Sequence, residues 1–217
     1  ASERSPTGVR RFLASHPGPC PTSHWAKVKF ERLPLLCLPT PCHRLDRLSE
    51  RLETEIWIKR DDLTGYAGGG NKGRKLEYLM PSLLASGCDT VLTSGAMQSN
   101  FVRHLAVACA QLHLAAHAVL MPNPYEPGRE AVGTVATRGG NRILGDLVGL
   151  TVHEVANGTW DELERETELV RAELEAKGAR VAVVPLGGSS VAGAYGFYQA
   201  AQELPRAFDW VICPTSS

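Results

Sequence analysis

The sequence predicts an α/β fold of three layers, in which a parallel sheet carries helices on both of its faces. From residue 89 onward, short apolar runs alternate with longer segments of helical periodicity. Two parallel strands need a crossover connection, which is usually a helix, so this alternation is typical of a parallel sheet. No internal repeat and no low-complexity tract interrupts the pattern.

The beginning of the chain has a different character. Residues 1–34 are expected to form an irregular arm that contains proline and serine. The prolines of "LPLLCLPTPCHRL" (33–45) predict an extended stretch, because proline is excluded from helix interiors and restricts the residue before it. Leucines then recur at helical spacing over 45–52, and "EIWIKRDDL" (55–63) alternates as a short strand does.

Strands and helices then take turns along the chain. Strands are predicted at 89–95, 116–121, 151–155, 180–188 and 209–213. Helices are predicted from residue 72, at 99–112, over a broken region at 129–149, and at 159–178 and 192–204. Ligands of such sheets bind at the carboxyl ends of strands. The sequence stops at "PTSS", directly after an apolar strand, so we expect a fragment of a longer chain.

The composition indicates a globular enzyme. Lys and Arg (23) balance Asp and Glu (23), which gives no general basic field for nucleic acid. No apolar run reaches the ~18 residues that a membrane-spanning helix needs. The six cysteines show neither CxxC pairing nor the spacing of metal ligands, which favours a reduced compartment and no metal site. We expect a cytoplasmic protein, with mitochondria as the alternative.

The stretch "GGGNKGRKLEYL" (68–79) places three glycines before two lysines and an arginine. On a helical wheel at about 100° per residue, Lys72 falls near the middle of an apolar stripe. Lys75 lies at the edge of the stripe, and Arg74 lies on the opposite side. The stripe consists of Leu76, Leu79, Met80, Leu83 and Leu84.

Lys72 is a candidate Schiff-base lysine. Burial and the positive end of the helix dipole both disfavour an ammonium group in the first turn. A neutral amine is the form that condenses with a carbonyl group, and the glycines let backbone and ligand approach closely. Taken alone, the stretch favours the alternative, a Gly-rich turn followed by a lysine whose charged end reaches solvent.

A second group of polar residues lies in "TSGAMQSNFVRH" (93–104), at a junction between strand and helix. Ser99 or Asn100 could cap the helix. Alternatively, the side chains of Gln98, Ser99 and Asn100 and the free N–H groups could hold a planar polar ligand or a carboxylate. The Lys-Ser/Thr pair of a P-loop is absent.

Two later loops repeat this arrangement at strand ends. "PLGGSS" occupies 185–190, and "PTSS" occupies 214–217. In a parallel sheet the carboxyl ends of the strands meet at one edge. Three small polar loops and one buried lysine therefore predict a single pocket.

The segments "IKRDDLTG", "GGGNKGRKLEYL", "TSGAMQSNFVRH" and "VPLGGSSVAGAYGFYQAAQEL" occur in an order and spacing that are specific to one family. From Leu35 to Ser217 the chain resembles the pyridoxal-phosphate enzymes of the D-cysteine desulfhydrase and 1-aminocyclopropane-1-carboxylate deaminase family. This resemblance implies the tryptophan-synthase-β-like fold (fold type II) without its C-terminal part. It also replaces the ordinary-turn interpretation of Lys72.

The resemblance also implies a domain organisation. After the arm at 1–34, residues 35–80 would form the first part of a large cofactor domain that includes the lysine loop. Residues 81–200 would form a small α/β domain. Residues 201–217 would return to the large domain and end within the phosphate loop.

The cofactor implied by the resemblance is pyridoxal 5'-phosphate, bound to Lys72 as a Schiff base. Asn71 would help to position it, and Asn100 would lie beside its 3'-oxygen. The start of the loop that grips the phosphate is implied at Thr215, Ser216 and Ser217.

Lys72 and Ser99 are the implied catalytic residues for a small amino-acid substrate. Lys72 would remove the α-proton as a general base. Gln98, Ser99 and Asn100 would bind the substrate, with Gln98 and Ser99 meeting its carboxylate or assisting proton movement.

The implied reaction is the α,β-elimination of D-cysteine to sulfide, pyruvate and ammonia. "KRDDLTG" looks more like the desulfhydrase branch than the deaminase branch, which opens a cyclopropane ring. Gly73 is smaller than the residue expected after the lysine, which leaves the substrate open. Relatives are commonly dimers, so a homodimer is expected. An alternative of another class is an inactive fragment that serves as a structural or interaction module in a larger assembly.

Overall fold

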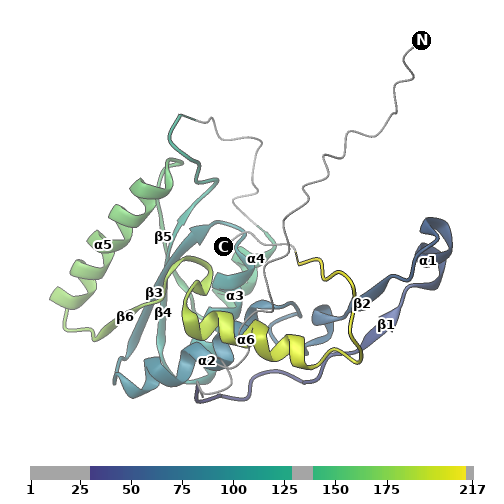
Figure 1. The fold of residues 1–217 in the computed structure, drawn as a ribbon. Helices are drawn as coiled ribbons and strands as arrows, with labels where there is room; N and C mark the ends of the chain where they lie inside the picture. The colour runs from purple at the N-terminus through teal and green to yellow at the C-terminus, as the bar shows by residue number, and fades with distance from the viewer. Residues whose placement is uncertain (1–29, 129–138, 214–217) are drawn as a thin grey trace, which may run out of the picture. The chain divides into compact units, whose positions relative to one another are not determined.

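The computed structural model describes residues 30–128 and 139–213 (Figure 1). The strands are β1 (Cys42–Arg44), β2 (Trp57–Lys59), β3 (Thr90–Ala96), β4 (Ala115–Met121), β5 (Thr151–Glu154) and β6 (Val181–Val183). The α-helices are α1 (Asp46–Leu52), α2 (Lys72–Ala85), α3 (Asn100–Gln111), α4 (Asn141–Leu147), α5 (Trp160–Ala176) and α6 (Val191–Gln202). Two short 3₁₀ helices are η2 (Asp61–Leu63) and η3 (Leu186–Gly188).

A four-stranded parallel sheet with the strand order β5-β4-β3-β6 forms the centre of the fold. Strand β3 pairs with β4 along its whole length, from Thr90 opposite Ala115 to Ala96 opposite Met121. Its first residues also pair with β6 on the other side. The short strands β1 and β2 form a separate antiparallel pair. The predicted parallel α/β architecture is confirmed.

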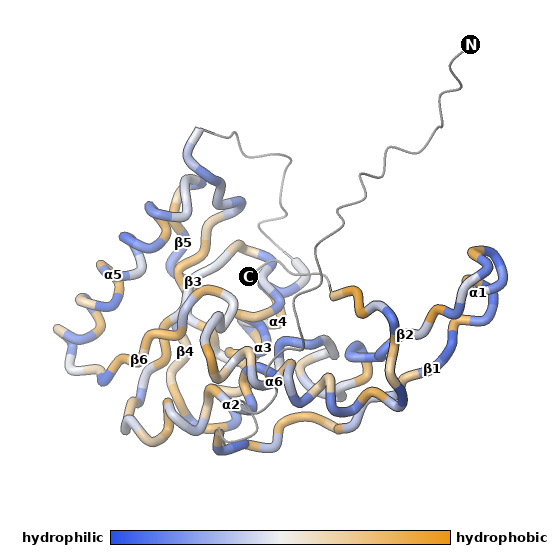
Figure 2. Tube along the Cα trace, in the orientation of Figure 1, coloured by the Kyte–Doolittle hydropathy of each residue, from blue (hydrophilic) through white to orange (hydrophobic). Residues whose placement is uncertain are grey.

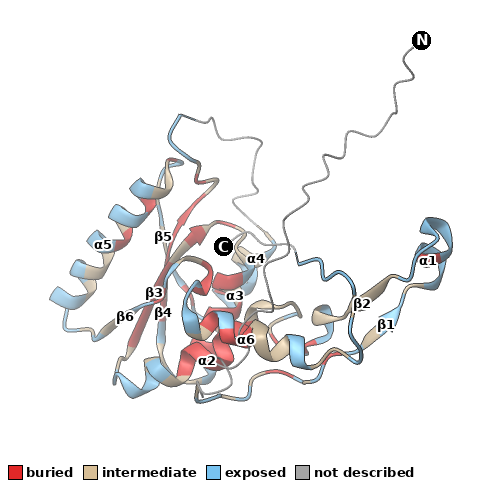
Figure 3. Cartoon of the chain, viewed as in Figure 1, coloured by how far each residue is buried: buried red, intermediate tan, exposed pale blue. Residues whose placement is uncertain are grey.

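Helices cover both faces of this sheet, as predicted (Figures 1 and 3). Because side chains alternate between the faces of a strand, Leu92 and Val119 pack against Leu163 of α5. Val91 and Ala118 point the other way and join Phe101 of α3 in the larger core. Figure 2 shows β3 and β4 in apolar colours and α5 largely hydrophilic, which fits a helix with one buried face.

Most predicted elements are present with nearly the expected bounds. Strands at 89–95, 116–121 and 151–155, and the first part of 180–188, correspond to β3–β6, and the later helices correspond to α3, α5 and α6. Of the broken region 129–149, the described residues 139–149 contain α4, and 129–138 lies outside the described residues. The described residues from Glu31 to Cys213 belong to one compact unit. The domain boundaries expected after residues 34, 80 and 200 stay a prediction.

The strand predicted at 209–213 is wrong. These residues form no ladder with any described strand. Trp210, Val211 and Ile212 are 87%, 71% and 92% exposed. An apolar run becomes a strand only where a partner supplies backbone hydrogen bonds, and the described sheet offers none here.

The described helices include none that is long and apolar enough to cross a membrane.

Helix α2 is buried on all sides in its first half, which the single apolar stripe did not predict. Every residue from Gly73 to Met80 is buried, including Arg74 opposite the stripe, whereas Leu84 at the stripe's far end is 39% exposed. Helix α6 packs against the side that carries Arg74. Gly196 permits the close approach, because a Cβ there would lie 2.1 Å from the backbone oxygen of Arg74.

The buried guanidinium of Arg74 joins elements that are distant in the chain. It donates to Asp61 of η2 at 2.8 Å and to Glu203, just after α6, at 2.8 Å. Lys59 of β2 pairs with the other oxygen of Glu203 at 2.6 Å. A buried cation with two carboxylates is electrically satisfied, but removing one partner leaves a costly unpaired charge.

We expect Glu203→Gln to flatten the acid limb of the stability profile. Burial by itself would raise the pKa of Glu203, but hydrogen bonds from Arg74 and Lys59 outweigh it and lower the pKa from 4.5 to about 2. A carboxyl group with a lowered pKa stabilises the fold above pH 4.5, and this contribution is lost as the pH falls toward 2. At pH 7, the free energy of unfolding of the variant should be about 3 kcal/mol lower than that of wild type. On acidification, the value for the variant should fall much less than the value for wild type does.

Urea unfolding between pH 7 and pH 3 measures this difference. Glu173→Gln is the matched control, because Glu173 forms an exposed pair with Lys177 at the C-terminal end of α5. The control should leave the profile nearly unchanged. A Glu203→Gln profile as steep as that of wild type would contradict the assignment.

Two glycines of the α2–α6 region should differ in their tolerance of alanine. A Cβ at Gly73 would lie 2.5 Å from Leu36 Cδ2, the end of a flexible side chain, whereas at Gly196 it would meet rigid backbone. We expect Gly73→Ala to cost about 1 kcal/mol and Gly196→Ala about 3 kcal/mol or more, although alanine is the better helix former. Denaturant unfolding tests this order, and Leu36→Ala should relieve Gly73→Ala but not Gly196→Ala.

Candidate active site

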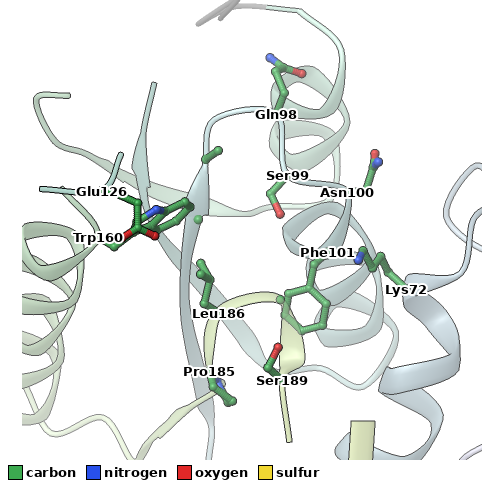
Figure 4. A pocket seen from close by; sticks show the side chains of 13 residues that line it. Lys72, Gln98, Ser99, Asn100, Phe101, Glu126, Trp160, Pro185, Leu186 and Ser189 are labelled. Carbon is green, nitrogen blue, oxygen red and sulfur yellow. The ribbon is translucent and has the colours of Figure 1, made fainter. Parts of the chain in front are cut away.

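A cavity of about 880 Å³ lies at the carboxyl ends of β3 and β6 (Figure 4). Lys72 lines it from the start of α2, and Gln98, Ser99 and Asn100 line it from the β3–α3 junction. The loop after β6 contributes Pro185, Leu186 and Ser189, and Phe101, Glu126 and Trp160 complete the wall. The volume is within the roughly 300–1,000 Å³ of ligand sites. The predicted convergence of Lys72 with two strand-end loops is therefore confirmed, and "PTSS" lies outside the described residues.

The three glycines before Lys72 form a turn that other residues would not tolerate. Gly68, Gly69 and Gly70 have φ angles of +81°, +83° and +114°, in the region that favours glycine. The N–H of Gly70 donates to the Asp61 carbonyl at 2.8 Å. A Cβ at Gly69 would lie 2.2 Å from the carbonyl oxygen of Asp62. The turn is thus pressed against η2, and this contact sets where α2 begins.

Lys72 is the first residue of α2 and is half-buried. The sequence predicted Lys72 near the middle of a buried stripe. In the structure the residue is only partly buried, and it lines the cavity. In Figure 4 the amine points toward Phe101, on the side of the cavity where Asn100 also lies. A primary amine at the carboxyl ends of parallel strands is available to a ligand carbonyl group.

The second lysine of the motif has a different part in the structure. Lys75 is buried, and its Nζ donates to the carbonyl oxygen of Gly187 in η3 at 2.7 Å. Burial, followed by the charge of Lys72, lowers the pKa of Lys75. The contact ties the loop after β6 to α2. The helical wheel did not reveal it, because it depends on a residue far along the chain.

Ser99 both caps α3 and lines the cavity. Its Oγ accepts a hydrogen bond from Val102 N at 3.3 Å, so the capping alternative is confirmed for Ser99. A hydroxyl that accepts one hydrogen bond still has its proton to donate. Figure 4 shows this hydroxyl on the side of the cavity. The Ser99 O–H group therefore stands at the positive end of a helix, beside the cavity.

Gln98 and Asn100 are held by the segment that enters α4. Gln98 Nε2 donates to Gly139 O at 3.2 Å, and its Oε1 accepts from Asn141 N at 2.9 Å. Asn141 Nδ2 donates to Asn100 Oδ1 at 2.9 Å. In Figure 4 the Gln98 side chain extends away from Lys72 and Ser189. The structure thus brings Lys72, Ser99 and Asn100 together, while the Gln98 amide binds neighbouring backbone.

The buried side chain of His104 contacts the backbone at the start of α3. His104 Nδ1 lies 2.7 Å from the carbonyl oxygen of Asn100. Burial lowers the pKa of His104 to about 4, so the ring is neutral at pH 7 and its protonated Nδ1 donates to that oxygen. A Cβ at Gly70 would lie 3.6 Å from the His104 ring. One neutral ring therefore supports both the lysine turn and the start of α3, and sequence reasoning missed it.

The structure does not test the roles expected of the other site residues. Asn71 occupies the N-cap position of α2, where its side chain makes no capping hydrogen bond, and it is not among the residues that line the cavity. The roles expected of Thr215, Ser216 and Ser217 fall outside the described residues. These assignments stay predictions.

The chain is similar to a known family and to several known proteins. Residues 33–217 match the family model of the "Pyridoxal-phosphate dependent enzyme". D-cysteine desulfhydrases of Salmonella newport and Salmonella heidelberg are 41% identical to the chain over 189 residues. The matches cover 85% of this chain and 54% of each relative.

Solved structures show the same relationship. The crystal structure of an ACC deaminase homologue superposes with a TM-score of 0.70 at 34% identity, over 84% of this chain and 52% of that one. The Escherichia coli diaminopropionate ammonia lyase in its apo form superposes with a TM-score of 0.53 at 18% identity, over 77% of this chain and 45% of that one. The second likeness shows the fold alone.

The matches agree with the geometry of the site and with the predicted fold type. The chain spans about half the length of the curated relatives that it matches. The family model covers the lysine turn, the β3–α3 junction and the loop after β6, which together line the cavity. The chain belongs to the family of pyridoxal-phosphate-dependent enzymes.

Proposed function

We propose that this chain carries the lysine-bearing part of a lyase that eliminates sulfide from D-cysteine and yields pyruvate and ammonia. One observation supports this above all. The amine of Lys72 and the hydroxyl of Ser99 lie at one cavity, in a chain that is 41% identical to D-cysteine desulfhydrases. The desulfhydrases are named for the amino acid D-cysteine, and the structure at 34% identity is that of an ACC deaminase homologue, so a small amino acid is the substrate class that we propose.

The described residues fit pyridoxal 5'-phosphate. The cavity is large enough, it carries a primary amine, and Phe101 and Leu186 offer apolar surface for a flat ring. Asn100 and Ser189 add polar groups along the wall. When bound, this cofactor supplies an aldehyde carbon for an amine and an electron sink for the carbanion formed at the substrate.

Lys72 would have two tasks in this site. Its amine would hold the aldehyde group of the cofactor, because a primary amine is the group that condenses with a carbonyl. Nζ would also serve as the general base that accepts the α-proton of the substrate. The contact of the glycine turn with η2 keeps the start of α2 in place, which would limit how far Lys72 can move from the cavity.

Ser99 would bind the substrate carboxylate. Its oxygen accepts from Val102 N, and the hydroxyl proton remains available for a hydrogen bond to a ligand. The N-terminus of α3 adds a positive potential at the same place, which favours an anionic group. Binding the carboxylate here would leave the α-carbon facing Lys72 across the cavity.

The choice between the desulfhydrase and the ring-opening deaminase rests on overall similarity. Asp61 of "KRDDLTG" binds Arg74, and Asp62 binds Arg60. This segment therefore does not line the cavity and cannot select a substrate directly. Identity is 41% to the desulfhydrases and 34% to the ACC deaminase homologue, which supports the desulfhydrase reaction.

The proposal extends to assembly and compartment. We infer a homodimer in a reduced, cytoplasmic compartment, and Cys37, Cys42, Cys88 and Cys109 form no disulfide, which supports the second point. The alternative of a structural module is favoured by one observation, the exposed apolar side chains of Trp210, Val211 and Ile212. Cofactor binding by the wild-type protein separates an enzyme from such a module.

We expect Lys72→Ala, in the full-length protein, to remove the absorbance of the protein-bound cofactor. Sulfide release from D-cysteine should fall by about 10²–10⁴-fold, because the general base is lost. Lys177→Ala is the control, since Lys177 is exposed just after the last residue of α5 and pairs with Glu173. Absorbance and sulfide release that survive in Lys72→Ala would overturn the assignment. A wild-type protein that binds no cofactor would favour the module.

Ser99→Ala and Ser190→Ala form a matched pair. Both serines cap helices, since Ser99 accepts from Val102 N and Ser190 accepts from Gly193 N at 3.0 Å. Each substitution should lower the free energy of unfolding by about 1 kcal/mol. Only Ser99 lines the cavity, so only Ser99→Ala should reduce kcat/KM, by about 10²-fold. Equal kinetic losses in the two variants would limit Ser99 to capping.

A further inference from the structure

Asn141 lies at the centre of a chain of hydrogen bonds beside the cavity. Its Oδ1 accepts from Arg103 Nη1 at 2.5 Å. Its Nδ2 donates to the backbone carbonyl of Gln98 at 2.7 Å and to Asn100 Oδ1 at 2.9 Å. Arg103 also donates through Nη2 to Gly69 O at 3.1 Å, so the chain begins at the turn before Lys72.

The chemistry of the partners fixes the direction of each amide. A guanidinium can only donate, so the atom of Asn141 that faces Arg103 must be its oxygen. A backbone carbonyl can only accept, so the atom that faces Gln98 O must be the Asn141 nitrogen. The two ends of the Asn141 amide are therefore assigned independently and agree, which removes the usual ambiguity between oxygen and nitrogen.

The orientation of Asn100 follows from that of Asn141. Since Asn141 presents an N–H group, the atom of Asn100 that receives it must be Oδ1. This contact leaves Asn100 Nδ2 as the part of the side chain that can meet a ligand. Asn100 is exposed and lines the cavity on the side of Lys72.

We propose that Asn141 is a positioning residue that makes Asn100 present its N–H group, and not its oxygen, to an anionic oxygen of the bound ligand. Arg103 fixes Asn141, and Asn141 fixes Asn100. The proposal rests on the proposed function only for the identity of that ligand, pyridoxal 5'-phosphate. A purely structural role is the competing explanation, in which Asn141 merely attaches the start of α4 to α3.

Two substitutions at one position distinguish these explanations. The carboxylate of Asn141→Asp has nearly the same shape and still pairs with Arg103, but it can only accept hydrogen bonds. Asn100 would then turn its Nδ2 toward Asp and its oxygen toward the ligand. Asn141→Ala removes the contact and leaves Asn100 free to turn either way. Both changes also remove the hydrogen bond to Gln98 O, so a structural role predicts damage that persists in the absence of the Asn100 side chain. A directing role predicts that aspartate is the more damaging change and that its excess effect requires Asn100.

The first measurement is the affinity of the full-length protein for pyridoxal 5'-phosphate, followed by absorbance. We expect Asn141→Asp to weaken binding by about tenfold or more, because a charge-assisted hydrogen bond is replaced by repulsion. Asn141→Ala should weaken it less. In an Asn100→Ala background, Asn141→Asp should change the affinity by less than about twofold, since the residue through which it acts is gone. The reverse order, or an effect that persists without Asn100, would overturn the proposal.

The second measurement uses the cofactor-free protein and is independent of catalysis. Side-chain amide resonances of Asn100 and Asn141 are assigned by their loss in the Asn100→Asp and Asn141→Asp spectra. In wild type, the Asn141 Nδ2 protons should exchange slowly and those of Asn100 quickly. In Asn141→Asp, the Asn100 protons should become protected. Asn100 protons that are equally protected in both proteins would refute the directing role, even if wild type binds no cofactor and the proposed function has failed.

Discussion

The buried guanidinium of Arg74 is the interaction on which the site depends. It binds Asp61 at the end of the β1–β2 region and Glu203 just after α6, and Lys59 shares the second carboxylate. Arg74 lies in the same first turn of α2 as Lys72, so the contacts of the guanidinium also fix the backbone that carries Lys72. A flexible surface lysine would lose side-chain entropy on reaching a ligand. Here the backbone beneath Lys72 is fixed by charge pairs and by a glycine turn pressed onto Asp62.

The rest of the cavity is also stabilised by polar side chains that form hydrogen bonds with backbone groups. Ser99 caps α3, Lys75 ties the loop after β6 to α2, and His104 supports both the lysine turn and Asn100. Ser99 itself lines the cavity, and Lys75 and His104 contact Gly187 and Asn100, which also line it. A site held by its own scaffold needs little reorganisation when a ligand arrives, which is the condition for effective positioning and electrostatic stabilisation.

The features that could be predicted share a local origin. The alternation of strands and helices from residue 89 indicated the parallel sheet, because the spacing of apolar residues differs between a helix and a strand and can be read within each segment. The convergence of Lys72 with the loops after β3 and β6 followed from the topology, since parallel strands end at one edge. The errors also share an origin. Arg74 was placed opposite the apolar stripe, but that side is covered by α6. The strand expected at 209–213 has no partner among the described strands.

The sequence by itself determined which segments are helices and strands, which lysine follows the glycine turn, and which loops meet at the sheet edge. These properties depend on neighbours within a few residues and on the handedness and direction of strand connections. Only the tertiary structure decided that Arg74 is buried, that Lys75 holds Gly187, and that Asn141 donates hydrogen bonds to Gln98 and Asn100. Those contacts join residues that are distant in the chain, and no local pattern of hydrophobicity or charge encodes which polar atom a folded partner will present.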